Sequence, residues 1–113
     1  MKQKEIWLVN LDPTVGAEIK KTRPCVVLNN DDIGVLPLKI VAPITKYKDN
    51  FSGADWMVKL KPDDENNLDE ISVIDLFQVR SVSEKRLVMK LGIISVDSLE
   101  KIKNAIKVVF DID

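Results

Sequence analysis

Residues 10–28 read NLDPTVGAEIKKTRPCVVL, and this stretch holds the end of one strand, a long loop and a second strand. Alternating apolar side chains over about residues 4–11 predict the first strand. The proline and glycine within residues 12–16 end that strand, and the polar residues that follow do not continue it. The apolar run of residues 24–28 is typical of a buried strand, and its proline stands first, where a missing N–H is tolerated. A loop of this length in a small domain is often functional.

The rest of the chain continues with short strands and ends in a helix. Apolar, β-rich runs predict four more strands, over residues 38–44, 56–60, 71–82 and 87–94. A short helical turn is expected over residues 83–86. Four apolar residues then repeat with the period of a helix, namely Leu99, Ile102, Ile106 and Val109. Ser95 or Asp97 can cap this helix, which is expected to end near Phe110. The pattern predicts a mainly β fold with α, in which a small twisted β-barrel carries a C-terminal helix.

The length of the chain limits its organisation. A chain of 113 residues has the size of one domain, so we expect a single domain over residues 1–113. Small domains often obtain extra buried surface by pairing, which favours a homodimer. No run of about 18 apolar residues predicts a membrane span, and the N-terminus lacks the long apolar run of a secretory signal. The sequence therefore predicts a cytoplasmic protein that does not enter a membrane.

The chain contains no histidine and one cysteine, Cys25. The lack of histidine excludes histidine acid–base chemistry, Ser–His and Cys–His nucleophile pairs and the usual zinc sites. Cys25 stands in an apolar run and is predicted to be a buried core thiol. Any catalysis must therefore come from carboxylates, arginine or lysine, hydroxyls, backbone amides or a carboxylate-bound metal.

Three later segments complete the pattern that begins with residues 10–28. They are APIT at residues 42–45, DLFQVRSV at residues 75–82 and the turn at residues 83–87. In order and spacing, over nearly the whole chain, these segments resemble the MazF/PemK family of toxins. That family shows a strand, an Asp-Pro-Thr-x-Gly-x-Glu loop, an Arg-Pro pair with an apolar strand, a strand ending in threonine and a later Gln-x-Arg strand.

The resemblance implies an SH3-like or CcdB-like twisted barrel and a homodimer. It also implies an endoribonuclease that cleaves single-stranded RNA at selected sequences without a metal or another cofactor. The expected protein partner is a cognate antitoxin whose acidic C-terminal segment occupies the RNA groove. By motif match, Arg23 and Thr45 inherit the catalytic roles, and Glu18 lies near them in the loop.

The chain departs from the family at one position. Many members carry an acidic residue just before the glutamine, and here that residue is Phe77. A role assigned to that carboxylate therefore has no counterpart at position 77. Asp75 stands two residues earlier and is expected on the same face of the predicted strand.

The chemistry of RNA cleavage suits these residue types. The 2′-OH of RNA can attack the adjacent phosphorus, which leaves a 2′,3′-cyclic phosphate and a 5′-hydroxyl. The guanidinium of Arg23 can grip two phosphate oxygens, and the Thr45 hydroxyl adds a donor aimed at the same charge. Because arginine is a poor proton acceptor, Glu18 is expected to accept or orient the proton of the 2′-OH.

Several residues are candidates for holding the RNA, namely Lys20, Lys21, Thr22, Lys46, Tyr47, Gln78 and Arg80. The lysines would attract phosphates, and Tyr47 could stack on an unpaired base. Gln78 and Arg80 could instead support the dimer. The other large aromatic residues, Trp7 and Trp56, are expected in the core.

Acidic residues gather in one later loop, at Asp63, Asp64, Glu65, Asp69 and Glu70. This loop lacks the regular oxygen-ligand spacing of a calcium site, so a solvated turn is expected. Its negative charge would repel RNA and confine binding to an opposite, basic face.

Two other functions stay open. A non-enzymatic toxin of the same fold could bind a protein target such as gyrase, because fold alone does not fix function. An RNA-binding module without catalysis would also fit. Taken singly, the site residues have structural interpretations as well: Arg23 could form a surface ion pair with Glu18, and Thr45 could simply end a strand.

Overall fold

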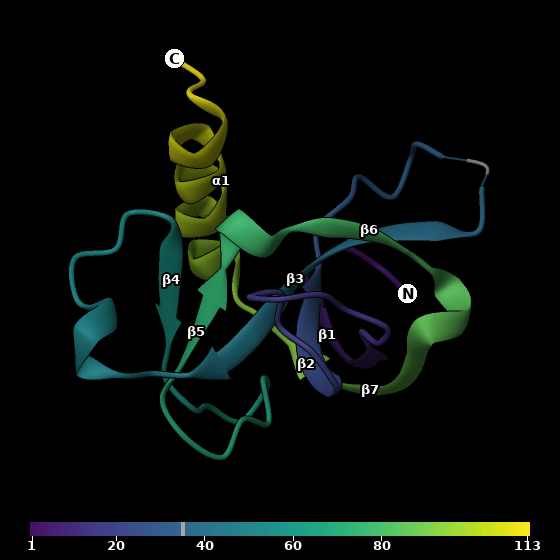
Figure 1. The fold of residues 1–113 in the computed structure, drawn as a ribbon, viewed down its shortest axis with the longest axis horizontal. Helices are drawn as coiled ribbons and strands as arrows, with labels where there is room; N and C mark the ends of the chain where they lie inside the picture. Colours follow the sequence, from purple (N-terminus) through teal and green to yellow (C-terminus); the bar gives the residue numbers. More distant parts are fainter. Residues whose placement is uncertain (35) are drawn as a thin grey trace.

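The computed structural model describes residues 1–34 and 36–113, which form a bent antiparallel sheet and one α-helix (Figure 1). The strands are β1 (Glu5–Asn10), β2 (Thr22–Val27), β3 (Leu38–Lys46), β4 (Met57–Leu60), β5 (Ser72–Asp75), β6 (Arg80–Ser83) and β7 (Leu87–Ile93). The short 3-10 helices are η1 (Asp49–Phe51), η2 (Leu76–Gln78) and η3 (Glu84–Arg86), and the α-helix is α1 (Val96–Phe110). None of the described helices has the length and apolar character needed to cross a membrane.

The long strand β3 joins the two halves of the sheet. Neighbouring strands follow the order β4-β5-β3-β2-β1-β7, and β6 also pairs with β3. In Figure 1, β4, β5 and α1 lie on one side of β3, while β1, β2 and β7 lie on the other. The described strands do not close into a ring, but the twisted, barrel-like sheet with its C-terminal helix confirms the predicted fold class.

Two cores lie on opposite faces of the central strands, because successive side chains of a strand point to opposite faces. Ile6, Val26 and Ala42 contribute to the first core, against which α1 packs. Val9 and Cys25 contribute to the second. Cys25 is fully buried, and burial, opposed by the charge of a nearby arginine, raises the pKa of its thiol to about 12. The predicted buried thiol is therefore confirmed.

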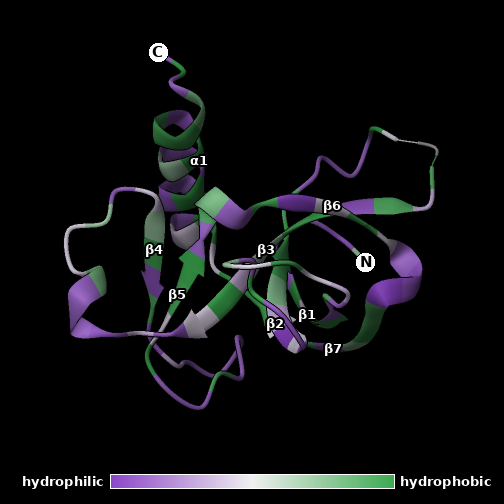
Figure 2. Ribbon diagram, in the orientation of Figure 1, coloured by the Kyte–Doolittle hydropathy of each residue, from purple (hydrophilic) through white to green (hydrophobic). Residues whose placement is uncertain are grey.

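The C-terminal helix follows the predicted stripe closely. The Ser95 hydroxyl accepts a hydrogen bond from the Ser98 N–H at 3.0 Å, which caps the helix. Leu99 and Ile102 are buried in the first core, and Ile106 and Val109 pack against it. Figure 2 shows this mixture of apolar and polar turns along α1, beside the apolar strand β5.

The prediction of one continuous strand over residues 71–82 is wrong, because the structure has two strands there. Both β5 and β6 lie along the same edge of β3, but η2 separates them. Ile44 pairs with Ile74, whereas Val41 pairs with Arg80, so η2 adds three residues that have no partner on β3. The physical cause is local, because the carboxylate of the last β5 residue accepts the Phe77 N–H and caps the 3-10 turn.

The two tryptophans have different environments. Trp7 is half-buried and packs against the second core, as predicted. Trp56 is 41% exposed, so its predicted place in the core is wrong. Trp56 stands just before β4, where its carbonyl accepts the Leu76 N–H at 3.0 Å while its side chain faces solvent.

Candidate active site

An open groove of about 480 Å³ lies where the loop between β1 and β2 meets the end of β3. The sequence-predicted residues that line it are Glu18, Lys20, Arg23, Thr45, Lys46 and Gln78. Six further residues line it without having been predicted as site residues, namely Ala17, Ile19, Lys48, Phe51, Met57 and Asp75. Lys48 belongs to the same basic run as Lys46, but no sequence signal distinguished Phe51 or Met57.

The pairing of β2 with β3 brings Arg23 and Thr45 together. Cys25 pairs with Pro43 at the end of this antiparallel pairing, and Arg23 and Thr45 lie two residues beyond that pair on the two strands, where both line the groove. Arg23 is exposed and Thr45 is half-buried, so both can be reached from solvent. The Arg23 Nε donates to the Lys20 carbonyl at 3.2 Å. Among the residues described, no hydrogen bond engages the terminal nitrogens of Arg23, which leaves them available to an anion.

Glu18 lies in the same groove but makes no ion pair with Arg23 within residues 1–34 and 36–113. Its Oε1 accepts the Val15 N–H at 2.7 Å, and its own N–H donates to the Val15 carbonyl at 3.2 Å. These bonds close a turn around Gly16, whose φ of 59° suits a residue without a Cβ. The second carboxylate oxygen of Glu18 has no hydrogen-bond donor in the described part of the chain.

Gln78 holds the loop in place. Its Oε1 accepts the Ile19 N–H at 2.6 Å, and its Nε2 donates to the Ala17 carbonyl at 3.4 Å. Gln78 reaches the loop because η2 interrupts the strand and projects it toward the groove. A residue considered from sequence as an RNA contact therefore has a structural task at the groove wall.

Two arginines anchor the base of the same loop. Arg80 donates through Nη1 to the Leu11 carbonyl at 3.2 Å, and it does not line the groove. Arg86 donates through Nη1 to the carbonyls of Asn10 and Asp12. Arg80 was predicted from sequence as a possible RNA contact, but in the structure its guanidinium binds the backbone at the base of the loop.

Asp75 is a buried carboxyl group on the groove wall. It is 7% exposed, and burial raises the pKa of its carboxyl above the ordinary value of 3.8, although hydrogen bonds from Phe77 and Gln78 partly oppose this. Phe77 is 71% exposed and does not line the groove. The expectation that Asp75 and position 77 share one strand face is wrong, because the strand ends at Asp75.

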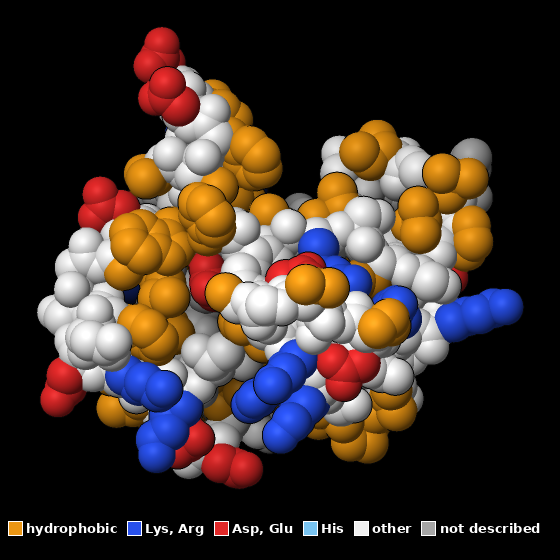
Figure 3. Space-filling view, in the orientation of Figure 1, with side chains coloured by type: hydrophobic (Ala, Val, Ile, Leu, Met, Phe, Trp, Pro, Cys, Tyr) orange, Lys and Arg blue, Asp and Glu red, His pale blue; other side chains and the backbone are white. Residues whose placement is uncertain are grey.

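Basic side chains surround the groove unevenly. Lys20, Lys46 and Lys48 line it, whereas Lys21 and Thr22 are exposed outside its lining. Figure 3 shows Lys and Arg side chains at the lower left, lower centre and right of one face, with Asp and Glu side chains among them. Tyr47 does not line the groove; the Lys59 Nζ lies 4.3 Å from the centroid of its ring. The cations near the groove are therefore concentrated on its rim.

The acidic loop that contains Asp63 and Glu70 lies closer to this site than we expected from its negative charge. Asp63 stabilises a turn, because its Oδ1 accepts the N–H groups of Glu65 and Asn66 at 2.9 and 2.7 Å. Glu70, however, lies 3.6 Å from the Lys46 Nζ. The expected placement of the acidic loop on an opposite face is wrong for Glu70, because the loop folds back beside the end of β3. No group of three or more His, Cys, Asp or Glu that could hold a metal occurs among the described residues.

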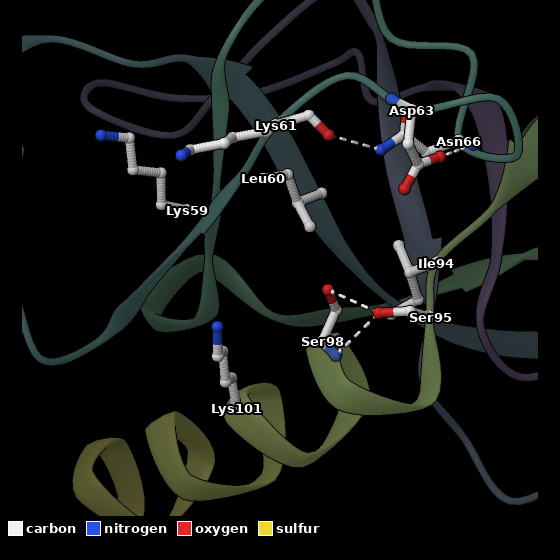
Figure 4. A pocket seen from close by; sticks show the side chains of 9 residues that line it. All are labelled: Lys59, Leu60, Lys61, Asp63, Asn66, Ile94, Ser95, Ser98 and Lys101. Carbon is white, nitrogen blue, oxygen red and sulfur yellow. Dashed lines mark hydrogen bonds between the residues drawn. The ribbon is translucent and has the colours of Figure 1, made fainter.

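A separate basic hollow of about 410 Å³ lies at the N-terminus of α1 (Figure 4). Three lysines line it, namely Lys59, Lys61 and Lys101. Neither Arg23 nor Thr45 reaches this hollow. The guanidinium and hydroxyl pair expected from sequence therefore lies at the groove beneath the loop and not at this basic hollow.

Comparison with known proteins identifies the family of the chain. Residues 2–110 match the family described as the PemK-like, MazF-like toxin of type II toxin-antitoxin system. The chain belongs to this toxin family. It is 32% identical to the endoribonuclease MazF of Staphylococcus saprophyticus, across 96% of this chain and 89% of that protein. It is 28% identical to the endoribonuclease MazF9 of Mycobacterium tuberculosis, across 99% of this chain and 98% of that protein.

The fold of this PemK/MazF chain is similar to that of solved structures. A mycobacterial endoribonuclease in complex with its cognate antitoxin superimposes with a TM-score of 0.79, covering 100% of this chain and 97% of that chain. The sequence identity is only 11%, so this likeness concerns the fold alone. It agrees with the barrel-like sheet and C-terminal helix described above.

Proposed function

We propose that this protein is a toxin that cleaves single-stranded RNA, as a metal-independent endoribonuclease. The observation that carries the proposal is that Arg23 and Thr45 line one open groove. Membership of the PemK/MazF family and the similarity to two proteins named as endoribonucleases support the same activity. Residues 1–113 act as a single domain.

The reaction uses the nucleophile that RNA itself carries. The 2′-OH loses its proton as its oxygen attacks the adjacent phosphorus, and the bond from phosphorus to the 5′-oxygen breaks. The leaving 5′-oxygen takes a proton from water, so the products are a 2′,3′-cyclic phosphate and a 5′-hydroxyl. The free terminal nitrogens of Arg23 bind the phosphate oxygens, and the Thr45 hydroxyl donates to the same charge. One such donor, placed in advance, is worth about 3–4 kcal/mol of transition-state stabilisation.

Glu18 is the residue that receives or orients the proton of the 2′-OH. Its side chain is already oriented by the Val15 N–H, and its other oxygen is open to the groove that Arg23 and Thr45 line. A carboxylate is a better proton acceptor than a guanidinium, which stays protonated. Glu18 therefore accepts or orients the proton, while Arg23 remains a cation.

The rim cations guide the RNA backbone to this centre. Lys20, Lys46 and Lys48 contact phosphates, with Lys21 and Thr22 on the adjoining surface, so binding weakens as salt rises. The active protein is a homodimer. Its protein partner is a cognate antitoxin with an acidic C-terminal segment, since the same rim attracts carboxylates and a related fold is known in complex with an antitoxin.

One experiment tests the proposal. The purified protein is incubated with a long single-stranded RNA in excess chelator, and the fragment ends are determined by mass spectrometry. We expect 2′,3′-cyclic phosphate and 5′-hydroxyl ends that disappear with Arg23→Ala and Thr45→Val and decrease with Glu18→Gln. Gln3→Ala serves as the control, because Gln3 lies outside the groove. RNA that stays intact, with or without tight binding, would refute the proposed activity.

A further inference from the structure

A hollow of about 290 Å³, different from the basic hollow of Figure 4, lies beside the groove; it is called the second hollow below. It shares three residues with the groove, namely Arg23, Thr45 and Lys46. Its opposite wall comes from the acidic loop, through Asp69 and Glu70. The shared residues therefore stand between two hollows. A nucleic acid with its scissile phosphate on Arg23 and Thr45 would have a hollow on either side of that phosphate.

The walls of this second hollow combine apolar and polar groups. Pro24, Leu68 and Leu91 are half-buried and line it, which provides an apolar surface for a flat ring. The carboxylate of Glu70 faces the Lys46 ammonium at 3.6 Å. The two carboxylate oxygens of Glu70 are acceptors, the Lys46 ammonium is a donor, and an apolar wall lies next to them. This arrangement suits one edge of a nucleobase better than it suits a phosphate.

The hollow is fixed by the way the acidic loop is attached. Asn66 is 2% exposed; its Oδ1 accepts the Leu68 N–H at 3.0 Å, and its Nδ2 donates to the Lys61 carbonyl at 2.9 Å. The loop also rests on β7, since a Cβ added at Gly92 would lie 2.3 Å from the Glu65 carbonyl oxygen. This close attachment fixes the backbone that leads to Asp69 and Glu70, while the Glu70 carboxylate itself is placed by its ion pair with Lys46.

We infer that the second hollow is a base-recognition site for the nucleotide next to the scissile phosphate, and that it prefers guanine; the inference rests on the proposed RNA cleavage. In single-stranded RNA the Watson–Crick edge is free to be read. Guanine offers two neighbouring N–H donors, at N1 and N2, to a carboxylate, and its O6 accepts from a cation. Glu70 and Lys46 present that acceptor and donor side by side. Uracil offers one donor between two acceptors, so the same carboxylate opposes it.

The test uses a single-stranded RNA library in which the two nucleotides flanking each cleavage site are random, with sequencing of the new 5′-hydroxyl ends. Wild-type protein is expected to favour guanine over uracil at one flanking position by about tenfold or more, the discrimination of one bidentate contact. Inosine, which lacks the N2 amino group, should lose most of this preference. Glu70→Gln and, separately, Asp69→Asn should reduce it in the same way.

Asp64→Asn is the matched control, because Asp64 belongs to the same acidic loop, loses the same charge and lies outside the hollow. We expect Asp64→Asn to keep the guanine preference even if weaker repulsion raises total cleavage. If cleavage remains Arg23-dependent but the base preference is the same in wild type, Glu70→Gln and Asp69→Asn, the inference is overturned and the proposed function stands. Absence of Arg23-dependent cleavage on every RNA would overturn both.

Discussion

Gln78 is predicted to control activity through the shape of the loop, without touching the reacting atoms. Gln78→Ala removes the 2.6 Å bond to the Ile19 N–H and the weaker 3.4 Å bond to the Ala17 carbonyl. A net hydrogen bond contributes about 0.5–1.5 kcal/mol, and an amide left without a partner adds to the loss. We therefore expect the ordered loop to lose about 1–2 kcal/mol, which is a factor of roughly 5–30 in the ratio of ordered to disordered loop.

The assay is single-turnover cleavage of a fluorogenic single-stranded RNA, combined with hydrogen exchange at the Ile19 amide. Gln78→Ala should lower the cleavage rate, by up to roughly 30-fold, and speed exchange at Ile19, with little change in the far-UV spectrum. Gln3→Ala is the matched control, because Gln3 also bonds a backbone carbonyl, that of Leu28 at 3.0 Å, away from the groove. Wild-type cleavage with unchanged exchange in Gln78→Ala would refute the reasoning.

Three further predictions concern stability, pH and salt. Gly92→Ala should lower the free energy of unfolding in urea by about 3 kcal/mol or more, because the new Cβ meets a backbone oxygen that cannot rotate away; a loss below about 1 kcal/mol would contradict this. The raised pKa of Asp75 means that the folded state holds its proton more tightly, so stability falls as pH rises from 3.8 through the folded pKa. Asp75→Asn should therefore gain in urea midpoint relative to wild type over that range, and a constant difference between pH 3 and pH 7 would contradict the argument. Lys20→Gln should reduce the slope of log affinity against log salt for a non-cleavable RNA analogue by roughly 0.7, the value for one phosphate contact, whereas Lys107→Gln on the exposed face of α1 should leave it unchanged.

The parts of the fold that sequence predicted well are those with strong periodicity. The alternation in residues 4–11 and the helical stripe from Leu99 onward each have one regular period, and the structure follows both. The interruption at residues 76–78 could not be found from apolar alternation, because that pattern continues across it. A carboxylate two residues before Phe77 is a capping signal, but only its contact with the Phe77 N–H shows that the cap forms.

The site was predictable as a set of residue types but not as a set of contacts. Arg23 and Thr45 line one groove because β2 pairs with β3, and the family resemblance had grouped these two residues as catalytic. Gln78 and Arg80 have the chemistry of RNA-binding residues, and sequence alone does not reveal that loop carbonyls and amides occupy them. The prediction that Glu70 lies opposite the basic face was wrong. It was based on charge repulsion of RNA, whereas the position of Glu70 depends on where the loop attaches to β7.

The distribution of charge around the groove restricts how a strand can lie in it. With a net charge of −1, the protein has no general attraction for RNA, so only the local cations can hold the backbone. Carboxylates repel a phosphate group. Three acidic residues line the groove or the second hollow together with Arg23, namely Glu18, Asp75 and Glu70. A bound strand must therefore set its phosphates on the cations and turn its hydroxyl and amino hydrogens toward the carboxylates. In the proposed function, that orientation would expose the 2′-OH to Glu18 and a base edge to Glu70 at the same time, so substrate selection and cleavage would depend on the same alignment of the backbone.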